Sequence, residues 1–139
     1  MFYLAYGMNS NKDSMAQRCP AAKSLGSVVL DGHKLAFKHF CDAVTDPQSQ
    51  MVCALWDITE NCERSLDALE GYPHFYGKKE VDVIYNGRKI RAMIYYMKDH
   101  YDYGIPSRSY LDMVVEGYRQ HDMMISQIVE ALEELEECT

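Results

Sequence analysis

The strongest constraint on the fold is an Asn-Gly pair that separates two segments with the composition of strands. Residues 80–85 and 89–97 are rich in β-branched and aromatic side chains, and Asn86-Gly87 lies between them. Asn and Gly tolerate the positive φ angles of a two-residue turn whose twist matches that of paired strands. The sequence therefore predicts an antiparallel β-hairpin over this segment.

More strands are predicted in the first half of the chain. Apolar runs or alternating patterns favour strands over residues 1–5, 25–30, 34–40 and 51–58. Asp31-Gly32 has the chemistry of a tight turn and predicts a hairpin between the second and third of them. A polar stretch at residues 45–48, which contains a proline, is expected to break the pattern before the last strand.

Helices are predicted in three places. Residues 11–18 lie between a polar cap and Pro20, and residues 59–70 carry apolar side chains at helical spacing before Gly71. After Pro106 the apolar residues again recur at helical intervals, so the C-terminal third is expected to be helical. The chain is thus expected to combine a sheet with flanking helices in an α+β fold.

Composition and charge exclude several classes of protein. The chain has 139 residues, 47% of them hydrophobic and 25% charged, and no linker interrupts it, so we expect one domain over residues 1–139. A net charge of -7 argues against nucleic acid as a partner. No apolar run approaches the roughly 18 residues of a membrane span. Five widely spaced cysteines, an odd number, fit a reducing, cytoplasmic environment.

Tyr6-Gly7-Met8-Asn9 follows the first predicted strand directly and is a candidate substrate-binding loop. Because Gly7 has no Cβ, backbone N–H groups could turn there toward an anionic or carbonyl oxygen. A glycine after a strand is also common in ordinary turns. The spacing alone leaves both interpretations open.

Glu70 is the candidate acid-base residue. It lies at the end of a predicted helix beside Leu69 and Phe75, and an apolar neighbourhood would raise the pKa of its carboxyl group toward neutrality. A carboxyl group with such a pKa is suited to proton transfer. A solvated residue in the last helical turn is the alternative. Tyr6 and Tyr76 could border the same cavity.

These motifs, in this order, resemble those of the γ-glutamylcyclotransferase or AIG2-like family. The loop at Tyr6 is similar to the family's Tyr-Gly-Ser-Asn, and the segment around Glu70 to the stretch that bears its catalytic glutamate. The other matching strings are Arg18-Cys19-Pro20, Trp56, Leu66-Asp67, Gly71-Tyr72, Tyr76, Pro106-Ser107, Tyr110-Leu111 and Gly117-Tyr118. The resemblance implies a mixed, strongly curved sheet or a small β-barrel flanked by helices.

The resemblance further implies an enzyme that releases 5-oxoproline and an amine from a γ-glutamyl amine or peptide. The substrate's own α-amine closes a five-membered ring on its γ-carbonyl, so no enzyme nucleophile is needed. Glu70 would act first as general base and then as general acid. Backbone N–H groups around Gly7, Met8 and Asn9 would hold the substrate carboxylate or the oxyanion.

Met8 departs from the family's loop, which usually has serine or threonine at this position. A hydroxyl contact cannot be carried over, and substrate preference could differ. The departure motivates a second hypothesis, in which the pocket only binds a small ligand and the chain acts as a sensor or interaction module. Transfer of the γ-glutamyl group, or its removal from a larger biosynthetic intermediate, is a third.

Neither a metal nor another cofactor is expected. The five histidines show no paired spacing, and no cysteine lies at ligand spacing from them. The expected partner is a small γ-glutamyl molecule, with no nucleic acid and no membrane. We expect the chain to be a monomer or a homodimer.

Overall fold

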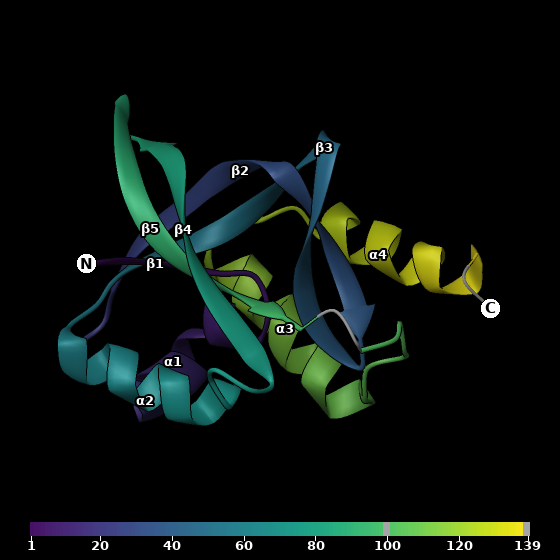
Figure 1. Ribbon diagram of the computed structural model, residues 1–139, viewed down its shortest axis with the longest axis horizontal. Coiled ribbons are helices and arrows are strands. Elements are labelled where there is room, and N and C mark those ends of the chain that lie inside the picture. Colours follow the sequence, from purple (N-terminus) through teal and green to yellow (C-terminus); the bar gives the residue numbers. More distant parts are fainter. Residues whose placement is uncertain (99–100, 138–139) are drawn as a thin grey trace.

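The computed structural model describes residues 1–98 and 101–137, and Figure 1 shows the arrangement of the elements. The strands are β1 (Phe2–Ala5), β2 (Lys23–Lys38), β3 (Phe40–Asp57), β4 (Tyr76–Tyr85) and β5 (Arg88–Met97). The helices are the 3-10 helix η1 (Met8–Ser10) and the α-helices α1 (Lys12–Arg18), α2 (Glu60–Glu70), α3 (Arg108–Gln120) and α4 (Ser126–Glu137).

The five strands form one mixed sheet in the order β2-β3-β1-β5-β4. The short strand β1 lies in the middle, antiparallel to β3 and parallel to β5. The predicted α+β class with a mixed, curved sheet is confirmed. The sheet is open rather than a closed barrel, because no ladder joins β2 to β4 in the described part of the chain. These two edges meet instead through side chains, with Lys79 Nζ 2.9 Å from His33 Nε2.

The Asn86-Gly87 hairpin is confirmed. Strands β4 and β5 pair antiparallel, and their register ends with Tyr85 opposite Arg88. Asn86 and Gly87 have φ angles of 50° and 76°, as a two-residue turn with positive φ at both central positions requires. The residue chemistry and the turn geometry agree here, so local information was sufficient.

The predicted turn at Asp31-Gly32 is wrong. Strand β2 runs through it, and the chain reverses further on at His39, which has a φ of 67°. Gly32 has a φ of 73° and lies at a register irregularity, where this single residue of β2 faces residues 46–49 of β3. The positive φ that glycine permits is therefore used in a bulge that bends the long ribbon. The extra residues of this bulge come from the polar stretch of β3. This stretch was expected to separate two strands, but β3 continues through it.

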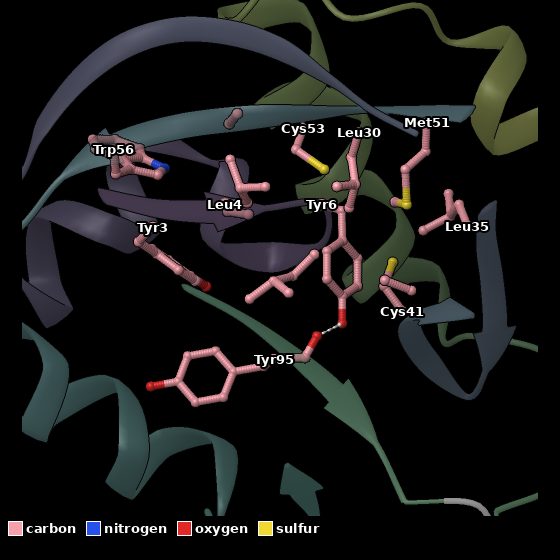
Figure 2. Close-up of a cluster of buried hydrophobic side chains, with 14 of the residues drawn as sticks. Tyr3, Leu4, Tyr6, Leu30, Leu35, Cys41, Met51, Cys53, Trp56 and Tyr95 are labelled. Carbon is pink, nitrogen blue, oxygen red and sulfur yellow. Dashed lines mark hydrogen bonds between the residues drawn. The ribbon is translucent and has the colours of Figure 1, made fainter. Parts of the chain in front are cut away.

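The core surrounds β1 and joins the sheet to the helices. Leu4, Phe37 and Tyr118 are completely buried, and Figure 2 shows Leu4 among side chains contributed by β2, β3 and β5. An apolar strand in the centre of a sheet, covered on both faces, accounts for the unbroken apolar run at the N-terminus. The end of β1 is thereby held rigidly where the loop to η1 begins.

Helix α2 has the boundaries that its capping residues predict. The Thr59 side chain accepts a hydrogen bond from the Cys62 N–H at the start, and Gly71 takes the left-handed conformation at the end with a φ of 63°. The N–H of Tyr72 donates to the Asp67 carbonyl over 3.0 Å, which completes the helix stop. Glu70 is consequently the last residue of the helix. Within the described residues, no helix is long and apolar enough to cross a membrane.

Candidate active site

A cavity of about 180 Å³ lies where the end of β1 faces the end of α2. All six residues predicted for the site line it: Tyr6, Gly7, Met8, Asn9, Glu70 and Tyr76. The structure adds seven more lining residues: Tyr3, Phe40, Cys41, Leu69, Phe75, Tyr95 and Tyr110. Residues far apart in the chain thus meet around one cavity. They come from every strand but β2 and from three of the helices or their flanks.

Glu70 carries a carboxyl group whose pKa is raised to about 7. The largest cause is desolvation by the surrounding protein, while the hydrogen bond from Asn9 and the charge of Arg18 act in the opposite direction. The position at the C-terminus of α2 adds to the effect, because the negative end of the helix dipole disfavours an anion. Near neutral pH the carboxyl group is therefore present in both protonation states.

Asn9 connects the loop to the carboxyl group. Its side-chain Nδ2 donates to Glu70 Oε1 over 3.1 Å and to the Tyr3 hydroxyl over 3.0 Å. The Asn9 carbonyl accepts from Trp56 Nε1 at 3.0 Å, which fixes the backbone of the residue. The Oδ1 atom is buried and has no hydrogen-bond partner in the described part of the chain. Such a group is unfavourable unless a ligand supplies a donor.

The loop requires glycine at position 7 because β3 approaches it closely. A Cβ on Gly7 would lie 2.9 Å from Cys41 Cβ and 3.0 Å from the Tyr110 hydroxyl oxygen. The loop hydrogen bonds use the Ser10 N–H, which donates to the Gly7 carbonyl, and the Asn11 N–H, which donates to the Met8 carbonyl. The sequence argument invoked the freedom of glycine to turn N–H groups. The structure adds a packing reason of equal force.

Helix α3 holds the loop from the other side. Tyr118 donates its hydroxyl hydrogen to the Tyr6 carbonyl over 2.8 Å. The preceding residue, Gly117, brings the helix so close to the end of η1 that a Cβ there would lie 2.6 Å from the Asn11 backbone nitrogen. The Gly117-Tyr118 pair therefore positions the loop without lining the cavity.

Tyr6 and Tyr76 form walls of the cavity, but their hydroxyl groups bind the protein itself. Tyr6 donates to the Tyr95 carbonyl over 2.6 Å, shown as a dashed line in Figure 2, and Tyr76 donates to the Cys41 carbonyl over 2.7 Å. Both residues are almost completely buried. They therefore offer a ligand the surfaces of their rings and not their hydroxyl hydrogens.

Asp67 supports the wall behind Glu70. It accepts hydrogen bonds from the Tyr95 hydroxyl at 2.6 Å and from Lys78 Nζ at 2.9 Å. Lys78 also pairs with Glu63 at 2.7 Å, so its charge is neutralised by two carboxylates of α2. Asp67 does not line the cavity, and its role is to orient Tyr95.

A family model for "Gamma-glutamyl cyclotransferase, AIG2-like" matches residues 3–112, which include every residue of the cavity wall. The chain belongs to this AIG2-like family. No curated protein matches the chain at a significant level. The family assignment agrees with the resemblance inferred from the sequence motifs.

Solved structures have the same AIG2-like fold. A structure titled gamma-glutamyl cyclotransferase superposes with a TM-score of 0.83 at 21% identity, covering 94% of this chain and 85% of that one. An uncharacterized protein from Homo sapiens has a TM-score of 0.79 at 24% identity, with coverages of 86% and 79%. YkqA from Bacillus subtilis has a TM-score of 0.76 at 19% identity, with coverages of 99% and 53%. At these identities the superpositions establish the fold.

Sequence reasoning missed Tyr3, Cys41 and Tyr95 as members of this AIG2-like site. Each lies in a strand or at its start, where an aromatic or small apolar residue is ordinarily part of the core. A period-two count could have placed Tyr3 and Tyr95 on a common face only if the β1–β5 pairing had been known. No local signal identified Cys41.

Metal ligands are not grouped in the described part of this AIG2-like chain. No cluster of three or more His, Cys, Asp or Glu side chains suited to an ion occurs there. Four cysteines, Cys19, Cys41, Cys53 and Cys62, are buried and form no disulfide.

Proposed function

We propose that this protein is a cyclotransferase that converts a γ-glutamyl amine or peptide into 5-oxoproline and a free amine. The observation that carries the proposal is a single carboxyl group, Glu70, with a pKa near neutrality beside a loop of backbone amides. A group that titrates close to the working pH can both accept and donate a proton within one catalytic cycle.

The reaction balances without an external reactant. The α-nitrogen of the γ-glutamyl group attacks the γ-carbonyl carbon, the new carbon–nitrogen bond closes the ring, and the bond to the departing nitrogen breaks. An α-ammonium loses two hydrogens to become the lactam N–H, and the departing nitrogen gains two to leave as an ammonium. Glu70 accepts each of the two protons in turn from the first nitrogen and delivers it to the second, so its carboxyl group returns to its starting state after each transfer.

The Tyr6–Asn9 loop is proposed to bind the negative charge of the substrate or transition state. The N–H groups of Gly7, Met8 and Asn9 are candidates, since the hydrogen bonds within the loop use those of Ser10 and Asn11. Donors aimed at a developing oxyanion contribute about 3 to 4 kcal/mol each. Backbone donors do not depend on the side chain, so Met8 is compatible with this role.

The unpartnered Asn9 Oδ1 is a candidate acceptor for the α-amine. It is buried beside Glu70, and an N–H of the substrate would provide the donor that it lacks. The amine would then lie between an amide oxygen and the carboxyl group that receives its proton.

The proposal is tested by incubating the protein with a panel of γ-glutamyl compounds and assaying 5-oxoproline. We expect product from the wild type and a loss of roughly 100-fold to 10,000-fold in kcat for Glu70→Gln. Full activity in that variant would exclude the proton shuttle. The matched control is Glu133→Gln on the exposed face of α4, which should retain wild-type activity.

The rival proposal is a binding module without turnover, motivated by Met8 in the cavity wall. It predicts that γ-glutamyl compounds raise the melting temperature while no 5-oxoproline appears from any of them. Product formation that depends on Glu70 would exclude it.

A further inference from the structure

The cavity has a polar inner end and an apolar outer end. The buried lining residues include Asn9 and Tyr3, whose polar atoms lie beside Glu70. The more accessible lining residues, Glu70 apart, are Met8, Phe40, Leu69, Phe75 and Tyr110, which together we call the apolar rim. The two ends therefore suit different parts of a substrate.

The apolar rim is a preformed ring surface. Phe40 meets Phe75 and Tyr110 edge to face, with ring centroids 6.0 and 5.3 Å apart. The Tyr110 hydroxyl oxygen accepts a hydrogen bond from the Cys41 N–H and is therefore occupied within the fold. Phe40 remains 44% exposed although its ring contacts two other rings. Aromatic side chains exposed at a cavity mouth favour an apolar ligand group.

Among the residues that the structure describes, the apolar rim presents no basic side chain to a carboxylate. Within residues 1–98 and 101–137, no Lys, Arg or His lines the cavity. Lys38 is paired with Asp42 at 2.8 Å and Lys78 with Asp67 at 2.9 Å. Lys98, which lies over the Tyr96 ring, and Arg18, whose charge acts on Glu70, are both outside the cavity lining. A carboxylate in the rim would lose water without gaining a partner and would lie close to the charge of Glu70.

We propose that the departing group of the substrate is an amine whose substituent is uncharged and apolar, aromatic or branched, and that it is not an α-amino acid. The inference rests on the proposed cyclotransfer, because the polar inner end is then filled by the γ-glutamyl head and the apolar rim by the amine that leaves. The observation that carries it is the juxtaposition of a polar inner end, an apolar rim and a described lining without Lys, Arg or His.

The test compares two compounds that differ by one carboxylate, γ-L-glutamyl-phenethylamide and γ-L-glutamyl-L-phenylalanine, with γ-L-glutamyl-methylamide as the ringless reference. We expect kcat/KM to be at least tenfold higher for the phenethylamide than for the phenylalanine compound, and higher than for the methylamide. Equal or reversed preference between the matched pair would overturn the inference while leaving the proposed function intact.

Phe40 provides the matched variants. Phe40→Ala should lower the ratio of kcat/KM for the phenethylamide to kcat/KM for the methylamide about fivefold to tenfold, because the contact with the substrate ring is lost. Phe40→Lys places a cation at the apolar rim and should raise kcat/KM for the phenylalanine compound. The control is Ile84→Lys, which adds the same charge at an exposed position of β4 and should change neither value.

A binding measurement keeps the inference testable without turnover. With Glu70→Gln, the phenethylamide compound should raise the melting temperature more than the phenylalanine compound at equal concentration. If no compound yields 5-oxoproline, the proposed function fails, and this comparison still decides the selectivity of the apolar rim. Equal stabilisation by both compounds would overturn it.

Discussion

Asn9 and Glu70, 61 positions apart in the chain, are joined by a hydrogen bond of 3.1 Å from the amide Nδ2 to the carboxyl Oε1. The bond favours the ionised carboxylate and so opposes the desolvation that raises its pKa. The balance of these two effects sets the pH at which Glu70 can act as a base.

Removing the Asn9 amide should move the pH dependence of the reaction. In Asn9→Leu the ionised carboxylate loses its donor, so the pKa of Glu70 rises further, by roughly one unit. The acidic limb of the kcat profile should shift to higher pH by that amount, and activity at pH 7 should fall. An unshifted limb would show that another group controls it. Asn61→Leu, at an exposed position of α2, should leave the profile unchanged.

Protein stability should also depend on the ionisation of Glu70. The pKa is about 7 in the folded protein against about 4.5 for an unperturbed glutamate, so the folded state binds the proton more tightly. The wild type should therefore lose stability relative to Glu70→Gln as the pH rises from 4 to 8, and be relatively most stable below pH 4.5. Because Glu70 is partly exposed, we expect a change of about 1 to 2 kcal/mol. Urea denaturation at both pH values measures it, and a constant difference would contradict the raised pKa.

Tyr3 should contribute to activity through Asn9. Its hydroxyl oxygen accepts the second Nδ2 hydrogen of the Asn9 amide, so Tyr3→Phe leaves a buried donor unpaired and frees the amide to rotate away from Glu70. We expect kcat to fall roughly tenfold, the acidic limb to shift, and unfolding stability to drop by about 1 to 2 kcal/mol. A loss of stability with an unshifted profile would limit Tyr3 to a structural role. Tyr85→Phe at the end of β4 is the control.

A change in the contact between α3 and η1 should alter the activity of the site. The methyl group of Gly117→Ala would lie within 2.6 Å of the Asn11 nitrogen, so the loop or the helix must move. We expect a loss of about 1 to 3 kcal/mol in unfolding stability together with a marked loss of 5-oxoproline formation. Glu116→Ala, the neighbouring exposed position, should affect neither. Full activity in Gly117→Ala would show that the loop tolerates displacement.

The predicted elements succeeded where the information is local. Asn86-Gly87 specifies a turn by its own backbone preferences, and Thr59 and Gly71 mark the ends of α2 by capping. The prediction of a turn at Asp31-Gly32 failed because local information was not sufficient there. The same positive φ of glycine fits a turn or a bulge, and only the pairing of β2 with β3 selects the bulge.

The residues of the candidate site likewise include some that the sequence identified and some that it did not. Glu70 and the loop from Tyr6 to Asn9 were identified from motifs whose order along the chain is visible in the sequence. Tyr3, Phe40 and Tyr95 were not, because a tyrosine or phenylalanine in a strand looks the same in the sequence whether it faces a cavity or the core. Tyr6 and Tyr76 were expected to border the cavity, and the structure adds that backbone carbonyls of neighbouring strands accept their hydroxyl hydrogens.

The sequence by itself determined the elements with local signals, the family, and the acidic residue at the end of α2. The tertiary structure alone decided that this acid meets Asn9, that it is largely removed from water, and that the described lining of its cavity has an apolar rim and no basic side chain. The physical reason is that a pKa and a binding preference depend on atoms within a few ångströms in space. Those atoms come from strands and helices that the order of the chain does not bring together.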